Sequence, residues 1–361
     1  MKEYYGYCCA CGCGLEESDA RFMEDDLYCD ECLDEVTVIC DECGKRIFER
    51  DSVGDDENRP LCSYCYDNYY TNCEECGRLI LREDAYYDED DNMICKECMQ
   101  KSPIYSYSYK PAPVFYGDDS NLFIGVELEM DEGGTDRENA RSLQRIAGNH
   151  IYIKNDSSLN DGFEVVTHPM TLQYHMQKMP WQGLLQEALW LGYRSHKAST
   201  CGLHCHVNRT AFGENYELQE SNIAKVLFLV EKYWDELLRF SRRTQSQMDR
   251  WAARYGFKEH PEQILQQAKC SCIGRYACVN LENYHTIEFR MWRGTLKYNT
   301  LIATLQMVTR LCEVAMFYSE KELQDMSWWR FVSQITEPEL ITYLKERRLY
   351  INEPVEMEEE E

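Results

Sequence analysis

Six Cys-x-x-Cys pairs within the first 100 residues constrain this 361-residue chain more than any other feature. Successive pairs are separated by 17, 7, 18, 7 and 18 residues, so the pattern repeats at offsets of 32 and 33 residues. Two thiolates three positions apart can bind one metal ion from a tight turn, and the glycine that follows the first pair of each repeat relieves the backbone. The twelve cysteines are Cys8, Cys11, Cys29, Cys32, Cys40, Cys43, Cys62, Cys65, Cys73, Cys76, Cys95 and Cys98.

The spacing favours three four-cysteine zinc sites in series. Acidic, turn-like stretches at 55–58 and 88–92 lie between apolar residues, as expected of a β-hairpin that returns the second pair to the first. The repeats resemble tandem zinc-ribbon or LIM-like modules, which implies about three structural Zn²⁺ ions. Interleaved pairing, of the first pair with the third, is the main alternative. Disulfides, iron–sulfur clusters and redox pairs fit less well, because no secretory signal is visible and the spacings and number of pairs differ.

The net charge of −26 is unevenly distributed. Residues 1–100 carry 28 acidic and 9 basic side chains, and 351–361 add six glutamates, which leaves 101–350 at −1. We therefore expect no nucleic acid as primary partner, because affinity for its phosphates rests on Lys and Arg. With no apolar run of about 18 residues, we also expect no membrane partner and a cytoplasmic location. An acidic zinc region favours protein interaction or a structural role over DNA binding.

Changes in composition predict the domain organisation. The zinc modules occupy 1–100. Residues 101–120 read KSPIYSYSYKPAPVFYGDDS, and their three prolines and alternating Tyr and Ser predict an extended linker. A larger domain then occupies 121–350, and 351–361 form an acidic tail.

Two stretches of the larger domain carry candidate acidic ligands. Residues 121–130, NLFIGVELEM, predict a strand in which Glu127 and Glu129 share one face. Two adjacent carboxylates repel each other unless a cation lies between them, although solvated surface glutamates are the simpler explanation. The stretches IYIKNDSSL and GFEVVTHPM predict two further strands, which carry Asp156 and Glu164.

Two later stretches add imidazoles and guanidinium groups. In CGLHCHVN, His204 and His206 share one face of a predicted strand and could bind a divalent metal, although core histidines are the alternative. In HTIEFRMWRGTL, Glu288 and Arg290 share a face and Arg293 follows at the strand end. A carboxylate beside two arginines suits a metal ion and a polyanion, whereas a cross-strand salt bridge is the alternative.

Taken in order, these motifs resemble the glutamine synthetase-like superfamily of carboxylate–amine ligases, and more narrowly the amidoligase family found in bacteria and phages. The resemblance covers roughly 121–320 and is carried by GVELEM, NDSSL with GFEVVTHP, CGLHCHVN and HTIEFRMWRGTL. It implies an α+β fold, in which a curved, mostly antiparallel sheet with helices packed on one side follows the small β-hairpin zinc modules. The chain departs from the family in reading Asp-Ser-Ser where relatives often have Asp-Gly-Ser, and in Cys205, where valine is more common.

The resemblance also implies that the inner face of the sheet holds ATP and two or three Mg²⁺ or Mn²⁺ ions. Glu127, His204 and Glu288 would hold the metal associated with the ATP phosphates. Glu129 and Glu164 would hold a second metal nearer the acyl acceptor.

Further roles follow from the same resemblance. Asp156 matches an acidic or polar family position, and His206 would orient nucleotide or substrate. Arg290 and Arg293 would contact the phosphates and the transferring phosphoryl group, because phosphoryl transfer needs cationic groups to balance charge in the transition state.

The resulting expectation is an ATP- and Mg²⁺-dependent ligase that joins a carboxylate to an amine through an acyl phosphate. The product would be an amide or isopeptide-like bond. The zinc modules would recruit a protein partner or substrate, and they favour a protein or peptide as the substrate. The alternatives are a catalytically inactive, nucleotide-binding zinc-module adaptor and a metal-dependent hydrolase that uses the same cluster.

Overall fold

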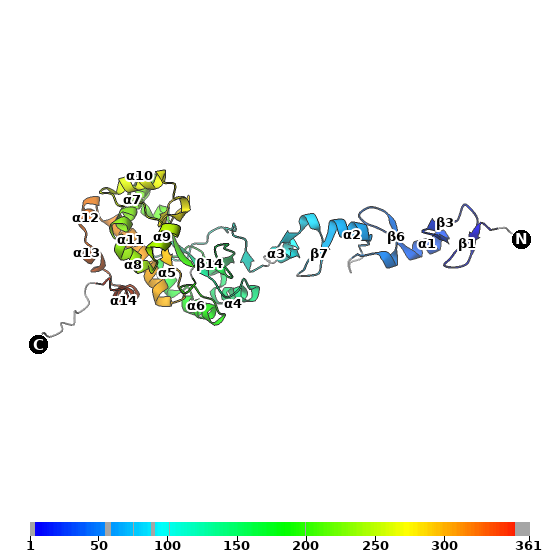
Figure 1. Ribbon diagram of the computed structural model, residues 1–361, viewed down its shortest axis with the longest axis horizontal. Helices are drawn as coiled ribbons and strands as arrows, with labels where there is room; N and C mark the ends of the chain where they lie inside the picture. The colour runs from blue at the N-terminus through cyan, green and yellow to red at the C-terminus, as the bar shows by residue number, and fades with distance from the viewer. Residues whose placement is uncertain are drawn as a thin grey trace. The chain divides into compact units, whose positions relative to one another are not determined.

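The computed structural model describes residues 4–54, 59–74, 76–87, 91–100, 102–198 and 200–350. The chain divides into an N-terminal unit that ends at Ser102 and a C-terminal unit that begins at Pro103 (Figure 1). The acidic stretch at 55–58, residues 88–90 of the second acidic stretch, and the tail at 351–361 lie outside the described residues.

Each repeat of the N-terminal unit begins with a turn between two short antiparallel strands, and the turn carries the first Cys-x-x-Cys pair. The glycine after the pair has a left-handed backbone, with φ between 70° and 74°, and its N–H donates to the carbonyl of the first cysteine at 2.8 Å. A side chain there would be strained, which explains the Cys-x-x-Cys-Gly sequence. The strand pairs are β1 (Gly6–Tyr7) with β2 (Gly14–Leu15), β5 (Thr37–Ile39) with β6 (Arg46–Phe48), and β7 (Tyr70–Asn72) with β8 (Leu79–Leu81).

The second Cys-x-x-Cys pair of each repeat lies at the start of a short helix. The helices are α1 (Asp30–Val36), α2 (Ser63–Tyr69) and α3 (Lys96–Gln100). Further hairpins, β3 (Arg21–Met23) with β4 (Asp26–Tyr28) and β9 (Tyr86–Tyr87) with β10 (Met93–Ile94), precede α1 and α3. Short 3₁₀ turns η1 (Glu49–Asp51) and η2 (Arg82–Asp84) follow β6 and β8. The predicted hairpin modules are therefore confirmed.

The C-terminal unit is built on a seven-stranded mixed sheet with the order β11-β13-β14-β12-β15-β17-β16. Every pairing is antiparallel except that of β11 with β13. This confirms the predicted mostly antiparallel sheet. The strands are β11 (Ile104–Tyr105), β12 (Ile124–Met130), β13 (Ile151–Lys154), β14 (Phe163–Thr167), β15 (Gly202–Asn208), β16 (Val279–Asn280) and β17 (Thr286–Arg293).

The edge strand β11 comes from the segment 101–120, for which the sequence predicts a linker. The ring of Tyr105 stacks on that of Tyr109 with 3.8 Å between centroids, and Tyr109 packs edge-on against Tyr152 of β13. Beyond β11 the segment has little regular structure.

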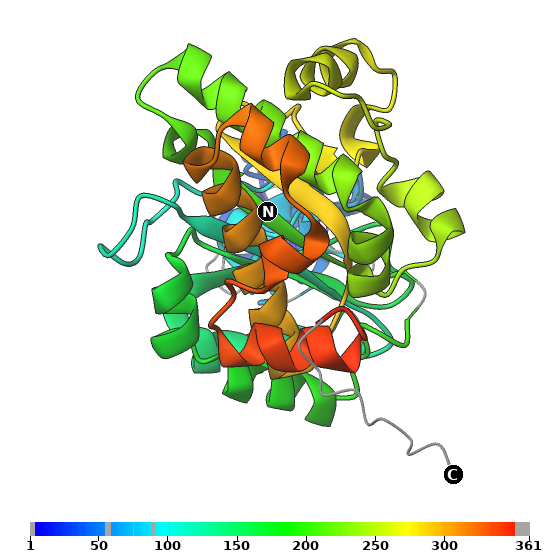
Figure 2. The same cartoon turned by 90° about the vertical axis from the view of Figure 1, so that its left-hand side faces the viewer.

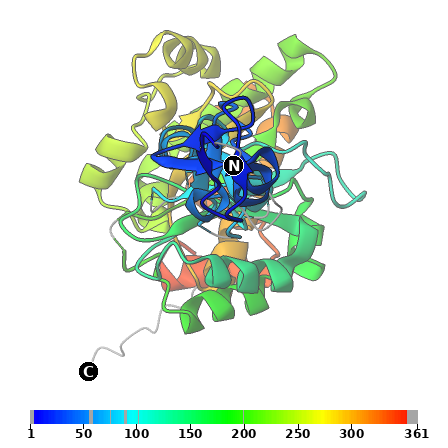
Figure 3. The ribbon, with the colours of Figure 1, turned by 90° about the vertical axis from the view of Figure 1, so that its right-hand side faces the viewer.

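Helices cover one face of the sheet, and α7 and α11 lie at the centre of this layer (Figure 2). In the opposite view, α4 and α6 lie together at the lower edge (Figure 3). The helices are α4 (Arg137–Ala147), α5 (Leu172–Gln177), α6 (Trp181–Trp190), α7 (Tyr216–Lys232), α8 (Trp234–Ser241), α9 (Gln245–Trp251), α10 (Pro261–Cys270), α11 (Tyr298–Phe317), α12 (Glu320–Asp325), α13 (Trp328–Val332) and α14 (Pro338–Glu346). Short 3₁₀ turns are η3 (Gly148–His150), η4 (Arg209–Phe212) and η5 (Gly274–Tyr276).

Helix α11 is the central core helix. By length and composition it could cross a membrane, but 78% of its apolar window is buried inside the unit. Such burial is typical of a core helix that packs on all sides.

Apolar and polar side chains alternate along the central strands, so one face of the sheet packs into the core and the other face is polar. Val126, Leu128, Val165 and Leu203 are fully buried in the apolar cluster under the helices. Because successive side chains of a strand point to opposite faces, the residues between them lie on the other side. That second face carries the polar motifs.

Candidate functional site

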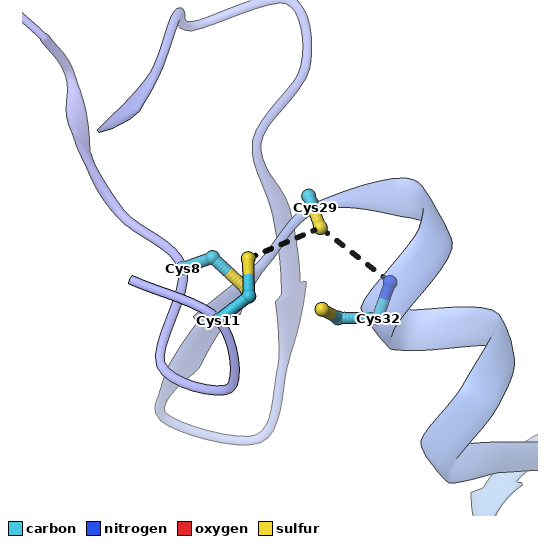
Figure 4. Close-up of side chains that lie close together, drawn as sticks. All are labelled: Cys8, Cys11, Cys29 and Cys32. Carbon is cyan, nitrogen blue, oxygen red and sulfur yellow. Dashed lines mark hydrogen bonds between the residues drawn. The ribbon is translucent and has the colours of Figure 1, made fainter. Parts of the chain in front are cut away.

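The two Cys-x-x-Cys pairs of each repeat come together as one four-cysteine cluster. In the first repeat, Cys8, Cys11, Cys29 and Cys32 place their Sγ atoms within 4.8 Å of one another (Figure 4). The second and third repeats do the same with Cys40, Cys43, Cys62 and Cys65, and with Cys73, Cys76, Cys95 and Cys98. In each cluster, one Sγ–Sγ separation between the two pairs is 3.8–3.9 Å. Tetrahedral Zn–S bonds of about 2.3 Å require about 3.8 Å. The clusters fit structural zinc, and the sequential pairing is confirmed over the interleaved alternative.

Backbone N–H groups donate hydrogen bonds to several sulfur atoms of these clusters. Hydrogen bonds from backbone N–H groups, led by that of Cys11, lower the pKa of the Cys8 thiol to about 6. The N–H groups of Cys62 and Cys95 donate to Cys40 Sγ and Cys73 Sγ at 3.3 Å. Helix N-termini provide the same kind of support, because Sγ of Cys29 and of Cys62 accepts from the first turn of α1 and α2 at 3.4 Å.

The first repeat contains two cysteines in addition to the four of its cluster. Cys9 and Cys13 are exposed and are not members of the four. The neighbouring Cys11 raises the pKa of Cys13 to about 12, so Cys13 is the poorer competitor for a metal.

On the C-terminal unit, strand registers align three rows of polar side chains across the polar face of the sheet. Directly opposed residues of antiparallel strands point to the same face. The rows are Lys154–Glu164–Glu129, Glu127–His204 and Asn280–Glu288–His206. The structure therefore brings together the acidic and imidazole residues that the sequence motifs single out.

A β-bulge in β17 allows Glu288, Arg290 and Arg293 to share this face. Cys205 pairs with Phe289 and Leu203 with Trp292, so β17 contains one more residue than β15 over the same stretch. Without the bulge, Arg293 would point into the core. With it, Trp292 is buried opposite Leu203, and Arg293 lies opposite Gly202.

Glu127 lies at the centre of the cluster. Its Oε2 is 3.4 Å from His204 Nδ1, and its Oε1 is 3.3 Å from His206 Nε2. Glu288 Oε1 lies 3.8 Å from His204 Nδ1 and 3.9 Å from His206 Nε2. Two groups of potential ligand atoms lie within 4.8 Å of one another: Glu127 with Glu164 and His204, and Glu127 with His206 and Glu288. The second group includes His206, for which the sequence resemblance implies an orienting role.

Side chains that the motifs do not single out hold this cluster in place. Lys154 Nζ lies 2.9 Å from Glu164 Oε2 and 4.0 Å from Glu127 Oε1. Asn280 and Asn283 donate to Glu288 Oε2 at 2.8 and 3.1 Å. Sequence reasoning missed these residues, although Lys154 could have been found from its place directly before the NDSSL motif.

The remaining predicted residues lie around the cluster. Arg290 donates to Glu288 Oε1, and the N–H of Gly202 donates to Glu129 Oε2. Glu129 Oε1 also lies 3.7 Å from His204 Nε2. Asp156 lies in the turn after β13, where its Oδ1 accepts from the Ser158 N–H at 2.7 Å.

Burial and the neighbouring charges separate the carboxyl groups into two classes. Burial opposes ionisation throughout, yet His206 and His204 hold the pKa values of Glu127 and Glu288 below their usual range. Burial raises the pKa of Glu129, and burial together with the Glu127 charge raises that of Glu164. The face therefore combines two firmly ionised carboxylates with two that resist ionisation in the absence of a further cation.

These groups fit a divalent metal ion. Carboxylate oxygen and imidazole nitrogen are ligands of Mg²⁺ and Mn²⁺. His206 Nε2 is buried, makes no hydrogen bond among the described residues, and points at the carboxylates of Glu127 and Glu288. An unpaired imidazole nitrogen between two carboxylates is a ready ligand position.

Comparison with known protein families finds a match to part of the chain. Residues 142–312 match a family described as "Putative amidoligase enzyme". The matched range runs from α4 to α11 and includes Glu164, both histidines of β15, and Glu288 with Arg290 of β17. No curated protein matches the chain. Because the match covers most of the polar face, the C-terminal unit, which follows three four-cysteine clusters that fit zinc, is similar to the putative amidoligase family.

Proposed function

We propose that the C-terminal unit is an ATP- and Mg²⁺-dependent ligase that forms an amide or isopeptide-like bond between a carboxylate and an amine. The observation that carries the proposal is the convergence of Glu127, Glu288 and the two histidines of β15 on the sheet face of a family-matched domain. The family match supports a ligase at the level of reaction class. ATP, magnesium and the acyl-phosphate route belong to the proposal.

The residues that would hold the metal ions are the two groups centred on Glu127. Mg²⁺ or Mn²⁺ bound there supplies positive charge for the phosphate oxygens of ATP. Asn280 and Asn283 fix the Glu288 carboxylate, so that its other oxygen remains directed at the histidines. Lys154 balances the charge of Glu164 at the opposite edge of the cluster.

Arg290 supports the part of the proposal that concerns phosphate. Its guanidinium is anchored by Glu288, and its Nε is buried without a hydrogen bond among the described residues. A carboxylate is a poor electrophile until its oxygen becomes a leaving group, and transfer of the terminal phosphoryl group of ATP achieves this. An anchored guanidinium can balance the charge that develops on the transferring group without having to reorganise.

The zinc modules would bring a protein partner or substrate to the ligase. Large side chains remain exposed on the described part of the N-terminal unit, among them Tyr7, Phe22 and Tyr64. Aromatic side chains in an acidic surrounding suit a protein or peptide better than a nucleic acid. We therefore extend the proposal to a macromolecular acid or amine.

The test is incubation of the full chain with ATP, Mg²⁺ and host lysate, followed by phosphate assay and by intact and peptide mass spectrometry. We expect adducts that have lost water, formed in parallel with phosphate release. Glu288→Gln should reduce the rate roughly 10²–10³-fold, because it removes an ionised group from the preorganised cluster. Glu282→Gln, an exposed change in the preceding loop, is the matched control.

Three outcomes discriminate between the candidate functions. Full ATP-dependent ligation by Glu288→Gln contradicts the site assignment. Nucleotide binding without turnover in the presence of amines favours the adaptor. Adduct-free hydrolysis that does not need ATP favours the hydrolase.

A further inference from the structure

A polar cavity lies in the C-terminal unit, apart from the side chains of the glutamate–histidine cluster. It measures about 510 Å³, and four arginines line it: Arg239, Arg242, Arg243 and Arg347. The first three come from α8 and the residues that follow it, and Arg347 comes from the end of α14. None of the four belongs to the sequence motifs.

In this arginine cavity, three of the four guanidinium groups are held by hydrogen bonds to neutral groups. Arg242 donates to the His196 imidazole at 3.1 Å and to the Arg293 carbonyl at 3.3 Å, and Arg243 donates to a backbone carbonyl at 3.2 Å. Arg347 donates to the Arg239 carbonyl at 2.9–3.0 Å. Among the described residues, no ion pair joins any of the four to a carboxylate, and the buried Nε atoms of Arg242 and Arg243 have no hydrogen-bond partner.

The other polar residues of the lining do not cancel the excess of positive charge. Burial and the charges of Arg242, Arg293 and Arg347 lower the pKa of His196 to about 4, so His196 is neutral at pH 7. Asp235 is the one acidic side chain in the lining. Four positive charges and one negative charge therefore meet in one cavity of a chain whose net charge is −26. Because such a group of like charges is costly without a counter-ion, the cavity is suited to an anion.

Arg243 connects the cavity to the glutamate–histidine cluster at Gly202. A Cβ atom added to Gly202 would lie 2.6 Å from His204 Nε2 and 2.8 Å from Arg243 Nη2, so these two groups flank the same stretch of backbone. Only glycine leaves room for both. Arg243 therefore borders both the cavity and the cluster.

We propose that the arginine cavity binds a non-reacting anionic group of the acid substrate, which makes that substrate a di- or polyanion such as a polycarboxylate. This inference rests on the proposed ligase function, and it names the class of acid. Guanidinium groups bind carboxylates in a bidentate manner, and four of them can bind more than one oxyanion. The lining offers one aliphatic side chain, Leu238, and no Phe, Tyr or Trp ring for an adenine, so the cavity suits the acid rather than the nucleoside.

The experiment measures binding to the full chain by calorimetry at low salt, without nucleotide. The probes are butyrate, glutarate and tricarballylate, which carry one, two and three carboxylates, with inorganic phosphate in parallel. We expect affinity to increase with the number of carboxylates and to fall with ionic strength. A stronger response to phosphate than to tricarballylate would assign the group as a phosphate ester and overturn the polycarboxylate assignment.

The variants are Arg239→Gln alone and Arg239→Gln with Arg347→Gln, and the control is Arg348→Gln, an exposed neighbour outside the lining. We expect the double variant to weaken tricarballylate binding at least tenfold and the single variant to weaken it less, with the control within twofold of the unmodified chain. The single variant, at an exposed side chain, keeps the test decisive if the double variant folds poorly.

A separate titration with Mg²⁺ and ADP distinguishes failure of this inference from failure of the proposed function. Binding of Mg·ADP that is unchanged in the double variant supports the inference. Equal binding of butyrate and tricarballylate, or no binding of tricarballylate, overturns it while the ligase proposal stands. Loss of Mg·ADP binding in the double variant also overturns it, because the cavity would then belong to the nucleotide. The protein could also bind tricarballylate through these arginines but fail to bind Mg·ADP. That result would support the anion site and contradict the proposed ligase function.

Discussion

The two units of this chain place their ligand residues differently with respect to their cores. In the N-terminal unit, cysteines such as Cys40, Cys65 and Cys73 are buried together with only a few apolar residues, among them Leu61 and Ile94. The C-terminal unit has one continuous apolar core, and its glutamates and histidines lie on the opposite face of the sheet. Small clusters of apolar side chains rarely stabilise a fold alone. The four-cysteine clusters are therefore part of the fold in one unit, whereas the candidate metal ligands of the other unit are an addition to its core.

Removal of zinc should produce the largest difference in stability between the two units. Structural zinc contributes roughly 10–16 kcal/mol per site in small modules, so a strong zinc chelator should unfold the N-terminal unit while α7, α11 and the sheet of the C-terminal unit persist. Native mass spectrometry should show three zinc ions before chelation, and circular dichroism should retain the helical signal afterwards. Fewer than two zinc ions, or simultaneous loss of both units, would contradict the comparison.

A matched pair of cysteine variants sharpens the comparison within one repeat. Cys11→Ser removes a member of the first cluster and should reduce the zinc count from three to two, with unfolding confined to that repeat. Cys13→Ser changes an exposed cysteine two positions further along, outside the cluster, and should retain all three ions. Zinc content by mass and protection from proteolysis are the measurements, and equal behaviour of the two variants would mean that the four ligands are misidentified.

In the C-terminal unit, loss of a ligand should affect function far more than folding. Glu127→Gln should lower ATP-dependent ligation about 10²-fold or more, because Glu127 belongs to both groups of ligand atoms. It should also diminish the increase in melting temperature that Mg²⁺ produces, because a ligand stabilises only the state that binds it. The metal-free melting temperature should change little. A large fall in the metal-free value would show that this cluster, like those of cysteine, is part of the fold.

The smallest expected effect concerns a buried histidine that supports the polar face from the core side. His175 Nε2 donates to the Ile124 carbonyl at 2.9 Å, and Trp181 Nε1 donates to its Nδ1 at 3.3 Å, so the ring is neutral. Burial lowers the pKa of His175 to about 4, below its value of about 6.5 in an unfolded chain. The unfolded state therefore binds more protons between these values, and stability present above pH 6.5 is lost as the pH falls toward 4.

Linkage gives this loss a magnitude of about 1 kcal/mol at pH 5.5 for His175 alone. Chemical denaturation of the C-terminal unit at pH 7.5 and 5.5 measures it, with His175→Gln as the variant that cannot titrate. The variant should be less stable at pH 7.5, and the difference between the two proteins should narrow at pH 5.5. A difference that stays constant would mean that His175 remains neutral in both states.

Local patterns predicted most of the ligands, whereas long-range register decided the rest. Repeat spacing was sufficient for the cysteine clusters, because both pairs of a cluster lie within one repeat. Period-two alternation was sufficient to put Glu127 with Glu129, and His204 with His206, on one face. It could not show that Lys154 lies opposite Glu164, or that Asn280 reaches Glu288, since those contacts depend on how separate strands align.

The arginine cavity was beyond sequence reasoning for the same reason. Arg239 and Arg347 are more than 100 positions apart and meet only because α8 and α14 pack at one end of the unit. Neither residue lies in a recognisable motif. Charge that is dispersed along a chain becomes a site only through tertiary packing.

The bulge in β17 makes the length of that strand as important as its composition. The buried Phe289 and Met291 could each be replaced by another apolar residue without altering which side chains face the glutamate–histidine cluster. Deletion of a single residue there would invert the remainder of the strand, sending the Arg293 charge into the apolar interior and the Trp292 indole into water. Related chains that preserve this chemistry should therefore tolerate changes at these two apolar positions but keep Arg290 and the residue count of the stretch.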